Sequence, residues 1–344
     1  MVAMQFQDTV FRVKRKFKMK RRDLLFALGV AIALLPLYPV AASAKELPPI
    51  QLPAGFQYPN GIARSKDGTL YVGSILSDRI LQIKPNGRIE TFFQGNEDIF
   101  AVTSLRLDEP RGILWGASPD VLGTPQSNGE ILYKPHRIFA IDISSGKVLQ
   151  VIMMPDGGFG NDLALDSQGG LYVTDTLRPR IHYLPPKATQ FQTWVEDERF
   201  RTQLRFGLSG IALRADGVLF VTMYSDGRLF KVTPRSMGNP QVEEIELPRR
   251  IDGSDGMQLA ADGSLIMIEG GIESGNGRLL QLHGLETGNN PQLQILASGM
   301  DLPVNLTVAG REVWVTESLF SHRLAPGRET EVPDRFFIRR FLLP

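Results

Sequence analysis

The sequence predicts an all-β fold, a six-bladed β-propeller of four-stranded antiparallel blades. A strand-like segment with a large apolar residue recurs six times, and long amphipathic helical runs are absent. Tyr71 and Trp314 are 243 residues apart, and five equal steps over this stretch measure 48.6 residues each. The repeated segments are Leu70–Val72, Leu114–Trp115, Leu171–Val173, Leu219–Val221, Leu265–Met267 and Val313–Val315. Units of this length that repeat six times are typical of propeller blades.

Each unit shows the same order of elements. A short apolar strand such as Gly61–Ala63 leads to a tight turn, marked by Asp-Gly at 67–68, 216–217 and 262–263, and then to the repeated core strand. A third strand opens with arginine, and a more polar outer strand such as Ile89–Phe93 follows. The predicted third strands begin at Arg79, Arg137, Arg180, Arg228, Arg278 and Arg335.

The sixth unit lacks an outer strand, because the chain ends at Pro344 soon after its third strand. Ile50–Leu52 precedes the first unit, where an outer strand is expected. We therefore predict that the N-terminal strand completes the last blade, which removes an open sheet edge. Residues 45–344 then form a single propeller domain.

Residues 1–44 have the pattern of an export signal. Basic residues at Lys18–Arg22 precede the apolar run Leu24–Leu35 and the small residues Ala42–Ala44, which predicts cleavage before Lys45. Twelve apolar residues span about 18 Å as a helix, too short for a hydrocarbon core of about 30 Å. We expect no permanent membrane span and a periplasmic or extracellular location. Arg21-Arg22 resembles a twin-arginine signal, and export in the unfolded state is the open alternative.

Charge and composition exclude several classes of function. Residues 45–344 carry 30 basic and 35 acidic side chains, so we do not expect nucleic acid as a partner. The chain has no cysteine, which excludes disulfides, thiolate metal sites and cysteine nucleophiles. The four histidines lie in different units without the spacing of a metal motif, so we interpret them as packing or surface residues.

The connectivity of a propeller predicts one mouth, where first-strand starts and second-strand ends meet. Alignment of the units places oxygen-bearing residues at every first-strand start: Asn60, Thr103, Asn161, Ser209, Asp255 and Asn305. The second strands end at Ser74, Ser118, Asp175, Met223, Glu269 and Glu317. Carboxylates near one opening favour a hard cation with oxygen ligands. Hydrogen bonding within a water-filled tunnel is the alternative explanation.

Two insertions are expected to overhang this mouth. Pro119–Pro135 in the second unit and Leu319–Asp334 in the sixth both lie between strands two and three. Loops of this length in a compact domain are usually functional. They are therefore expected to shape a substrate pocket.

Several motifs resemble those of the SMP-30/gluconolactonase/LRE-like propellers over residues 50–344. They are Asn161-Asp162, Gly207-Leu208-Ser209-Gly210 and Ser254-Asp255-Gly256-Met257 followed by Asp262-Gly263. The resemblance implies a divalent cation at the mouth, held by Asn161 and Asp255, and Asp255 as catalytic base. Asn60 stands where the family has a glutamate, and Ser209 stands where it has an asparagine. Thr103, Asn305, Asp175, Glu269 and Glu317 are further candidate mouth residues.

These observations lead to a functional hypothesis. We expect an exported, metal-dependent hydrolase of lactones or related esters that acts on a small-molecule substrate. Ca²⁺ is the favoured cation, with Mg²⁺, Mn²⁺ and Zn²⁺ as alternatives. The cation would polarise the carbonyl, and a carboxylate, Asp255, would activate water. The alternative hypothesis is a non-catalytic propeller that binds a small molecule or a protein, because the first- and fourth-blade positions depart from the family pattern.

Overall fold

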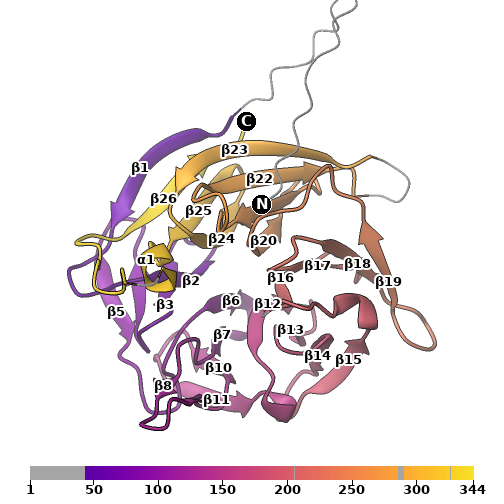
Figure 1. Cartoon of the computed structure of the whole chain (residues 1–344), viewed down its shortest axis with the longest axis horizontal. Helices are drawn as coiled ribbons and strands as arrows, with labels where there is room; N and C mark the ends of the chain where they lie inside the picture. Colours follow the sequence, from indigo (N-terminus) through magenta and orange to yellow (C-terminus); the bar gives the residue numbers. More distant parts are fainter. Residues whose placement is uncertain (1–42, 205, 286–289, 326) are drawn as a thin grey trace, which may run out of the picture. The chain divides into compact units, whose positions relative to one another are not determined.

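The computed structural model describes residues 43–204, 206–285, 290–325 and 327–344, and it confirms a six-bladed propeller. Six antiparallel sheets of four strands follow one another around the ring (Figure 1). The expected export signal lies outside the described residues, except for Ser43 and Ala44 at its end. Within the described part of the chain, no helix is both long and apolar enough to span a membrane.

The first three blades follow the chain in order. Blade 1 contains β2 (Pro59–Arg64), β3 (Leu70–Ser74), β4 (Ile80–Ile83) and β5 (Ile89–Phe93). Blade 2 contains β6 (Ser104–Asp108), β7 (Ile113–Ser118), β10 (Arg137–Asp142) and β11 (Val148–Met153), with the hairpin β8 (Thr124–Pro125) and β9 (Ile131–Leu132) between its second and third strands. Blade 3 contains β12 (Gly160–Leu165), β13 (Leu171–Asp175), β14 (Arg180–Leu184) and β15 (Gln192–Glu196).

The other three blades complete the ring. Blade 4 contains β16 (Leu208–Leu213), β17 (Leu219–Met223), β18 (Leu229–Thr233) and β19 (Gln241–Ile245). Blade 5 contains β20 (Ser254–Leu259), β21 (Leu265–Glu269), β22 (Gly277–His283) and β23 (Gln292–Met300). Blade 6 contains β24 (Pro303–Ala309), β25 (Glu312–Glu317), β26 (Phe337–Leu342) and β1 (Lys45–Gln51). A short helix, α1 (Ser321–Leu324), precedes β26.

Blade 6 closes the ring as expected from the sequence. β1 pairs antiparallel with β26, and Lys45 lies opposite Leu342 (Figure 1). The prediction for the third strand of this blade was two residues off, because β26 begins at Phe337 and not at Arg335. Phe336 is buried and its carbonyl accepts a hydrogen bond from the Leu52 N–H, so this segment packs in the core before the strand begins.

The hydrophobic core consists of six layers between neighbouring blades. One layer joins blades 1 and 2 through residues such as Tyr71 and Phe139, and another joins blades 3 and 4 through Ile181 and Phe230. Both faces of second strands such as β3 and β17 are therefore buried, which explains their almost continuous apolar sequences. These layers leave the inner strands to line the central channel.

The Asp-Gly turns have the geometry that their sequence indicates. Gly68, Gly217 and Gly263 have φ values of 94°, 88° and 81°, in the region that favours glycine. The preceding aspartates accept a backbone N–H two residues later in the chain, at 2.9 Å for Asp67. Each turn thereby fixes the register of the first two strands.

Candidate functional site

The start of the inner strand is irregular in five of the six blades. In β2, β12, β16 and β20 the strand pairing skips two residues, and in β24 it skips one. The skipped residues are Asn60-Gly61, Asn161-Asp162, Ser209-Gly210, Asp255-Gly256 and Val304. Such a bulge turns side chains away from the regular ladder. It therefore explains how residues within buried strands can face the channel.

Close packing between inner strands explains why a glycine follows Asn60, Ser209 and Asp255. A Cβ at Gly210 would lie 2.1 Å from the carbonyl oxygen of Asp255, and a Cβ at Gly256 would lie 2.7 Å from Asn305 Oδ1. Only glycine permits these approaches. They bring Ser209 of blade 4 next to Asp255 of blade 5.

A cavity of about 140 Å³ lies at the mouth, and four of the predicted site residues line it: Asn60, Thr103, Asn161 and Asp255. Most other lining residues are apolar or aromatic, and Phe159, Phe206 and Tyr224 are among them. The structure thus brings together the polar residues of blades 1, 2, 3 and 5. Asp255 is the single charged residue of this lining.

Asp255 is held by a neighbouring blade. The Ser209 hydroxyl donates to Asp255 Oδ1 at 2.9 Å, and Oδ2 makes no hydrogen bond to another described residue. Burial raises the pKa of Asp255 to about 7; the Ser209 hydrogen bond opposes this shift and the nearby Asp162 carboxylate adds to it. Ser209 is itself fully buried and does not line the cavity. It acts on Asp255 and not on a ligand in the cavity.

The orientation of the Asn161 amide follows from a chain of hydrogen bonds. The Thr176 hydroxyl donates to the Leu208 carbonyl at 2.6 Å, so its oxygen accepts the 2.9 Å bond from Asn161 Nδ2. This leaves Asn161 Oδ1 as the unengaged atom of the amide. The Asn60 side chain makes no hydrogen bond to any described residue. Both asparagines can therefore present an oxygen to the cavity.

The carboxylates at the second-strand ends have different roles, because their partners lie within the protein. Glu269 is fully buried and forms ion pairs with Arg249 and Arg278, and it accepts the Asp252 N–H at 3.0 Å. Burial raises the pKa of Glu269, but the hydrogen bonds from the two arginines outweigh it and the net shift is downward. This side chain does not line the mouth cavity.

The carboxylates of Asp175 and Glu317 also bind groups within the protein. Asp175 accepts the N–H groups of Phe159 at 2.9 Å and Leu177 at 3.1 Å, and it lies 3.3 Å from His182 Nε2. Glu317 accepts the Asp301 N–H at 2.8 Å and pairs with Arg339 at 3.0 Å. Neither lines the mouth cavity. Together with Glu269, these acids hold the loops that lead into the inner strands.

The alignment of blade 6 shifts by one residue. Val304, not Asn305, lines the mouth cavity at the position equivalent to Asn60. Asn305 is buried; its Oδ1 accepts the Leu306 N–H at 2.9 Å and its amide nitrogen donates to the Thr103 carbonyl at 3.4 Å. Pro303 pairs with Glu317 and Leu306 with Val315, as Pro59 pairs with Ser74 and Ile62 with Val72, so the two-residue equivalent of Asn60-Gly61 is Val304-Asn305. Asn305 therefore belongs to a second, deeper set of polar side chains.

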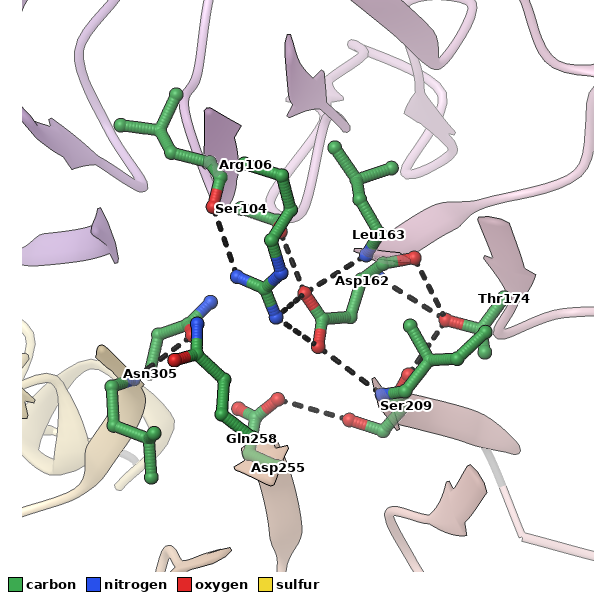
Figure 2. A network of polar contacts seen from close by, with 12 residues as sticks. Ser104, Arg106, Asp162, Leu163, Thr174, Ser209, Asp255, Gln258 and Asn305 are labelled. Atoms are coloured by element: carbon green, nitrogen blue, oxygen red, sulfur yellow. Dashed lines mark hydrogen bonds and ion pairs between the residues drawn. The ribbon is translucent and has the colours of Figure 1, made fainter. Parts of the chain in front are cut away.

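This deeper set is centred on an ion pair that the sequence did not indicate. Arg106 Nη2 lies 2.9 Å from the Asp162 carboxylate, which also accepts the Ser104 hydroxyl at 2.7 Å and the Ile211 N–H at 3.2 Å. Figure 2 shows these side chains, with Asp255 and Asn305, directed toward one another from different inner strands. Arg106 lines a separate cavity, of about 350 Å³, formed by the later residues of the inner strands. The ion pair thus joins the inner strands of blades 2 and 3, and the Ile211 N–H extends the contact to blade 4.

The two insertions contribute to the mouth as expected. Val121 and Leu122 of the blade 2 insertion line the cavity, and so do Phe320 and Leu324 of the blade 6 insertion. The second insertion is fixed by the buried His322: its Nδ1 lies 3.0 Å from the Arg328 carbonyl, so Nδ1 carries the proton and Nε2 accepts from the Tyr58 hydroxyl at 3.2 Å. Apolar loops therefore cover a polar floor.

Tyr224 is a cavity residue that the sequence reasoning missed. It follows the end of β17 directly and packs edge-on against Phe206, with 5.8 Å between ring centroids. Burial raises the pKa of its hydroxyl strongly, with a further contribution from Asp255, so the hydroxyl keeps its proton. Its position one residue after a second-strand end was the available signal.

The donor set at the mouth is rich in oxygen and poor in charge. Within the described part of the chain, no group of three or more His, Cys, Asp or Glu side chains could hold a metal ion. Asp255, Asn161, Asn60 and Thr103 instead offer one carboxylate with amide and hydroxyl oxygens. This chemistry fits a hard cation that binds weakly, and it does not fit a zinc site built on histidine or cysteine.

Solved structures with the same architecture are similar to the chain over most of its length. A gluconolactonase from Xanthomonas campestris is 14% identical, with 88% of this chain and 97% of that chain covered and a TM-score of 0.57. The chain has the fold of gluconolactonase-like propellers. A virginiamycin B lyase from Staphylococcus aureus (15% identity, 88% and 100% covered, TM-score 0.56) and a PQQ-bound aldose sugar dehydrogenase from Streptomyces coelicolor (15%, 87% and 98%, 0.56) are similar to the same extent.

These likenesses show the fold and do not select a chemistry, because the activities named for the three proteins differ. No family model and no curated protein matches the sequence. The arrangement of side chains at the mouth therefore has to carry the functional argument.

Proposed function

We propose that the mouth cavity hydrolyses a lactone or a related ester and that Asp255 is its general base. The observation that carries the proposal is the placement of this carboxylate. It is the single charged group of a mostly apolar cavity, with one oxygen held by Ser209 and the other unengaged. A gluconolactonase is among the proteins that share this fold, so the fold is compatible with this reaction class.

The residues of this chain suffice for a balanced reaction. Asp255 takes a proton from a water molecule while the water oxygen forms a bond to the ester carbon. The amide of Asn60 can donate to the carbonyl oxygen as it becomes negative. The proton on Asp255 then passes to the alkoxide as the ester C–O bond breaks, which opens the ring and leaves a hydroxy acid. The apolar walls keep other water away from the bond.

A divalent cation is part of the proposal. Oxygens of Asp255, Asn161, Asn60 and Thr103 would hold it, and Ca²⁺ fits this donor set best, before Mg²⁺ and Mn²⁺. When bound, it would polarise the ester carbonyl as a Lewis acid. With a single carboxylate we expect weak binding. Calorimetric titration of chelator-treated protein with each metal tests this, and equal heats for wild type and Asn161→Ala would contradict the assignment.

Export is proposed from the N-terminal sequence alone. The basic residues, the apolar run and Ala42–Ala44 support cleavage before Lys45 and a periplasmic or extracellular location. N-terminal sequencing of the protein recovered from cell fractions tests it. A mature chain that retains residues 1–44 in the cytoplasmic fraction would overturn it.

Turnover of a panel of aldonolactones and simple lactones tests the reaction. We expect Asp255→Asn to lose about 10²- to 10⁴-fold in kcat, the usual contribution of a general base. Asp334→Asn, at an exposed position, is the matched control and should behave as wild type. The proposal fails if folded wild-type protein hydrolyses no lactone or ester with any of the metals, and retained ligand binding in that case would favour a non-catalytic binding protein.

A further inference from the structure

A second cavity adjoins the one at the mouth. It has a volume of about 420 Å³ and is formed largely by the blade 2 insertion. Val121, Phe159 and Phe206 line both cavities. An elongated ligand can therefore extend from Asp255 across these apolar side chains into the second cavity.

His136 places a fixed hydrogen-bond donor on the wall of the second cavity. Its Nδ1 accepts the Asp120 N–H at 3.0 Å, so the proton of the neutral ring is on Nε2. Burial lowers the pKa of His136, against the opposing effect of Asp120 and Asp175, which keeps the ring neutral at pH 7. The Phe159 ring packs against it at 4.8 Å between centroids. Nε2 has no hydrogen-bond partner among the described residues.

Lys134 adds a positive charge to the same wall. Its ammonium lies 4.8 Å from the centre of the Phe100 ring and forms no ion pair within the described residues. The acid on this wall, Asp120, is engaged by the N–H groups of Gly123 and Lys134, each at 2.9 Å. A ligand would thus meet an unpaired cation and an unpaired N–H donor at the far end of an apolar passage.

We propose that the second cavity binds the end of the substrate remote from the hydrolysed bond, and that this end is a carboxylate or a similar anionic hydrogen-bond acceptor. His136 Nε2–H donates to it and Lys134 neutralises its charge. The apolar chain between the two ends contacts Val121, Phe159 and Phe206. This inference rests on the proposed function and narrows its substrate to lactones or esters with an acidic side chain.

Lactones with an alkyl side chain of variable length test the inference. Each length is prepared with a terminal carboxylate, carboxamide or methyl group, and kcat/KM is measured. At one length we expect the carboxylate to exceed the methyl compound by about tenfold or more. Lys134→Ala should remove the preference for carboxylate over carboxamide. His136→Phe should remove the preference for carboxamide over methyl, and His136→Gln should restore part of it.

Lys147→Ala, on the β10–β11 turn of the same blade, is the matched control and should leave all three rates unchanged. Normal turnover of the methyl series with no preference between end groups, or with a preference that Lys134→Ala and His136→Phe leave intact, overturns the inference and leaves the proposed function standing. If no lactone is hydrolysed, calorimetry with the corresponding lactams decides. Carboxylate-selective binding that both variants lose supports the second site without the reaction, and binding without selectivity overturns it.

Discussion

Two rings of polar side chains encircle the mouth, and they differ in what their atoms contact. The first-strand residues Asn60, Asn161 and Asp255 line a cavity and keep unengaged oxygens. The carboxylate oxygens of the second-strand residues Asp175, Glu269 and Glu317 instead contact groups within the protein. These groups are backbone N–H groups and the side chains of His182, Arg249, Arg278 and Arg339. The same residue types therefore stabilise the fold in one ring and are available to a ligand in the other.

The pKa shifts of Glu269 and Asp255 have opposite directions, in agreement with this difference. The hydrogen bonds of two arginines lower the pKa of Glu269 in spite of its burial, whereas burial raises that of Asp255. An ionised Glu269 contributes stability, and an ionised Asp255 costs it. Substitutions at the two positions should consequently change the free energy of unfolding in opposite directions.

The largest effect is expected for Glu269→Ala. It leaves Arg249 and Arg278 without their shared partner and the Asp252 N–H unsatisfied, which should cost about 3 kcal/mol of unfolding free energy. Chemical denaturation at pH 7 measures this. Glu198→Ala removes an exposed ion pair with Arg201 and should leave stability almost unchanged. Similar losses of unfolding free energy for Glu269→Ala and Glu198→Ala would contradict the structural role assigned to Glu269.

Asp255→Asn should stabilise the protein at pH 8 in the presence of a chelator. The folded-state pKa of about 7 lies above the unfolded value, so the contribution of the carboxyl group is fully present below pH 4 and is lost as the pH rises through 7. The amide avoids the buried charge, so Asp255→Asn should gain a few kcal/mol over wild type at pH 8.

Thermal unfolding at pH 4, 6 and 8 measures the difference between Asp255→Asn and wild type. The difference should grow with pH and level off above 7. A difference that is independent of pH, or one that is matched by Asp334→Asn, would contradict the assigned environment of Asp255.

A smaller effect is expected for Ser209→Ala. Loss of the 2.9 Å hydrogen bond removes an interaction that holds the pKa of Asp255 down, so that pKa should rise. Stability should fall by about 1 kcal/mol. The acidic limb of the pH profile of kcat should move to higher pH, because Asp255 must lose its proton to act as a base. Ser118→Ala, which removes hydrogen bonds to the Phe100 and Ala101 N–H groups in the other ring, should alter stability without moving the profile.

The fold could be predicted from the sequence because every unit repeats the same local information. The apolar strands, the Asp-Gly turns and the unpaired strand at Ile50–Leu52 each indicate an element, and six copies agree. The start of β26 was misplaced because Phe336 packs in the core, a contact with no local signal. The order of the strands could thus be predicted from the sequence, while the start of β26 depends on tertiary packing.

The candidate site was only partly accessible. The positions of Asn60, Thr103, Asn161 and Asp255 followed from aligning the units, and the structure places all four on one cavity. The ion pair of Glu269 with Arg249 could not be predicted, because Arg249 comes from another segment of the chain. Arg106 had no signal, because its partner Asp162 lies 56 residues away and pairs with it only after blades 2 and 3 pack together.

The pairing of β1 with β26 has a consequence during synthesis of the protein. Lys45 leaves the ribosome almost three hundred residues before Leu342, the residue it will face. Until then, β1 has no strand to pair with, and the ring of blades stays open between the first blade and the last. A ribosome that stalls late should therefore display an open ring whose exposed edge attracts chaperones or other chains.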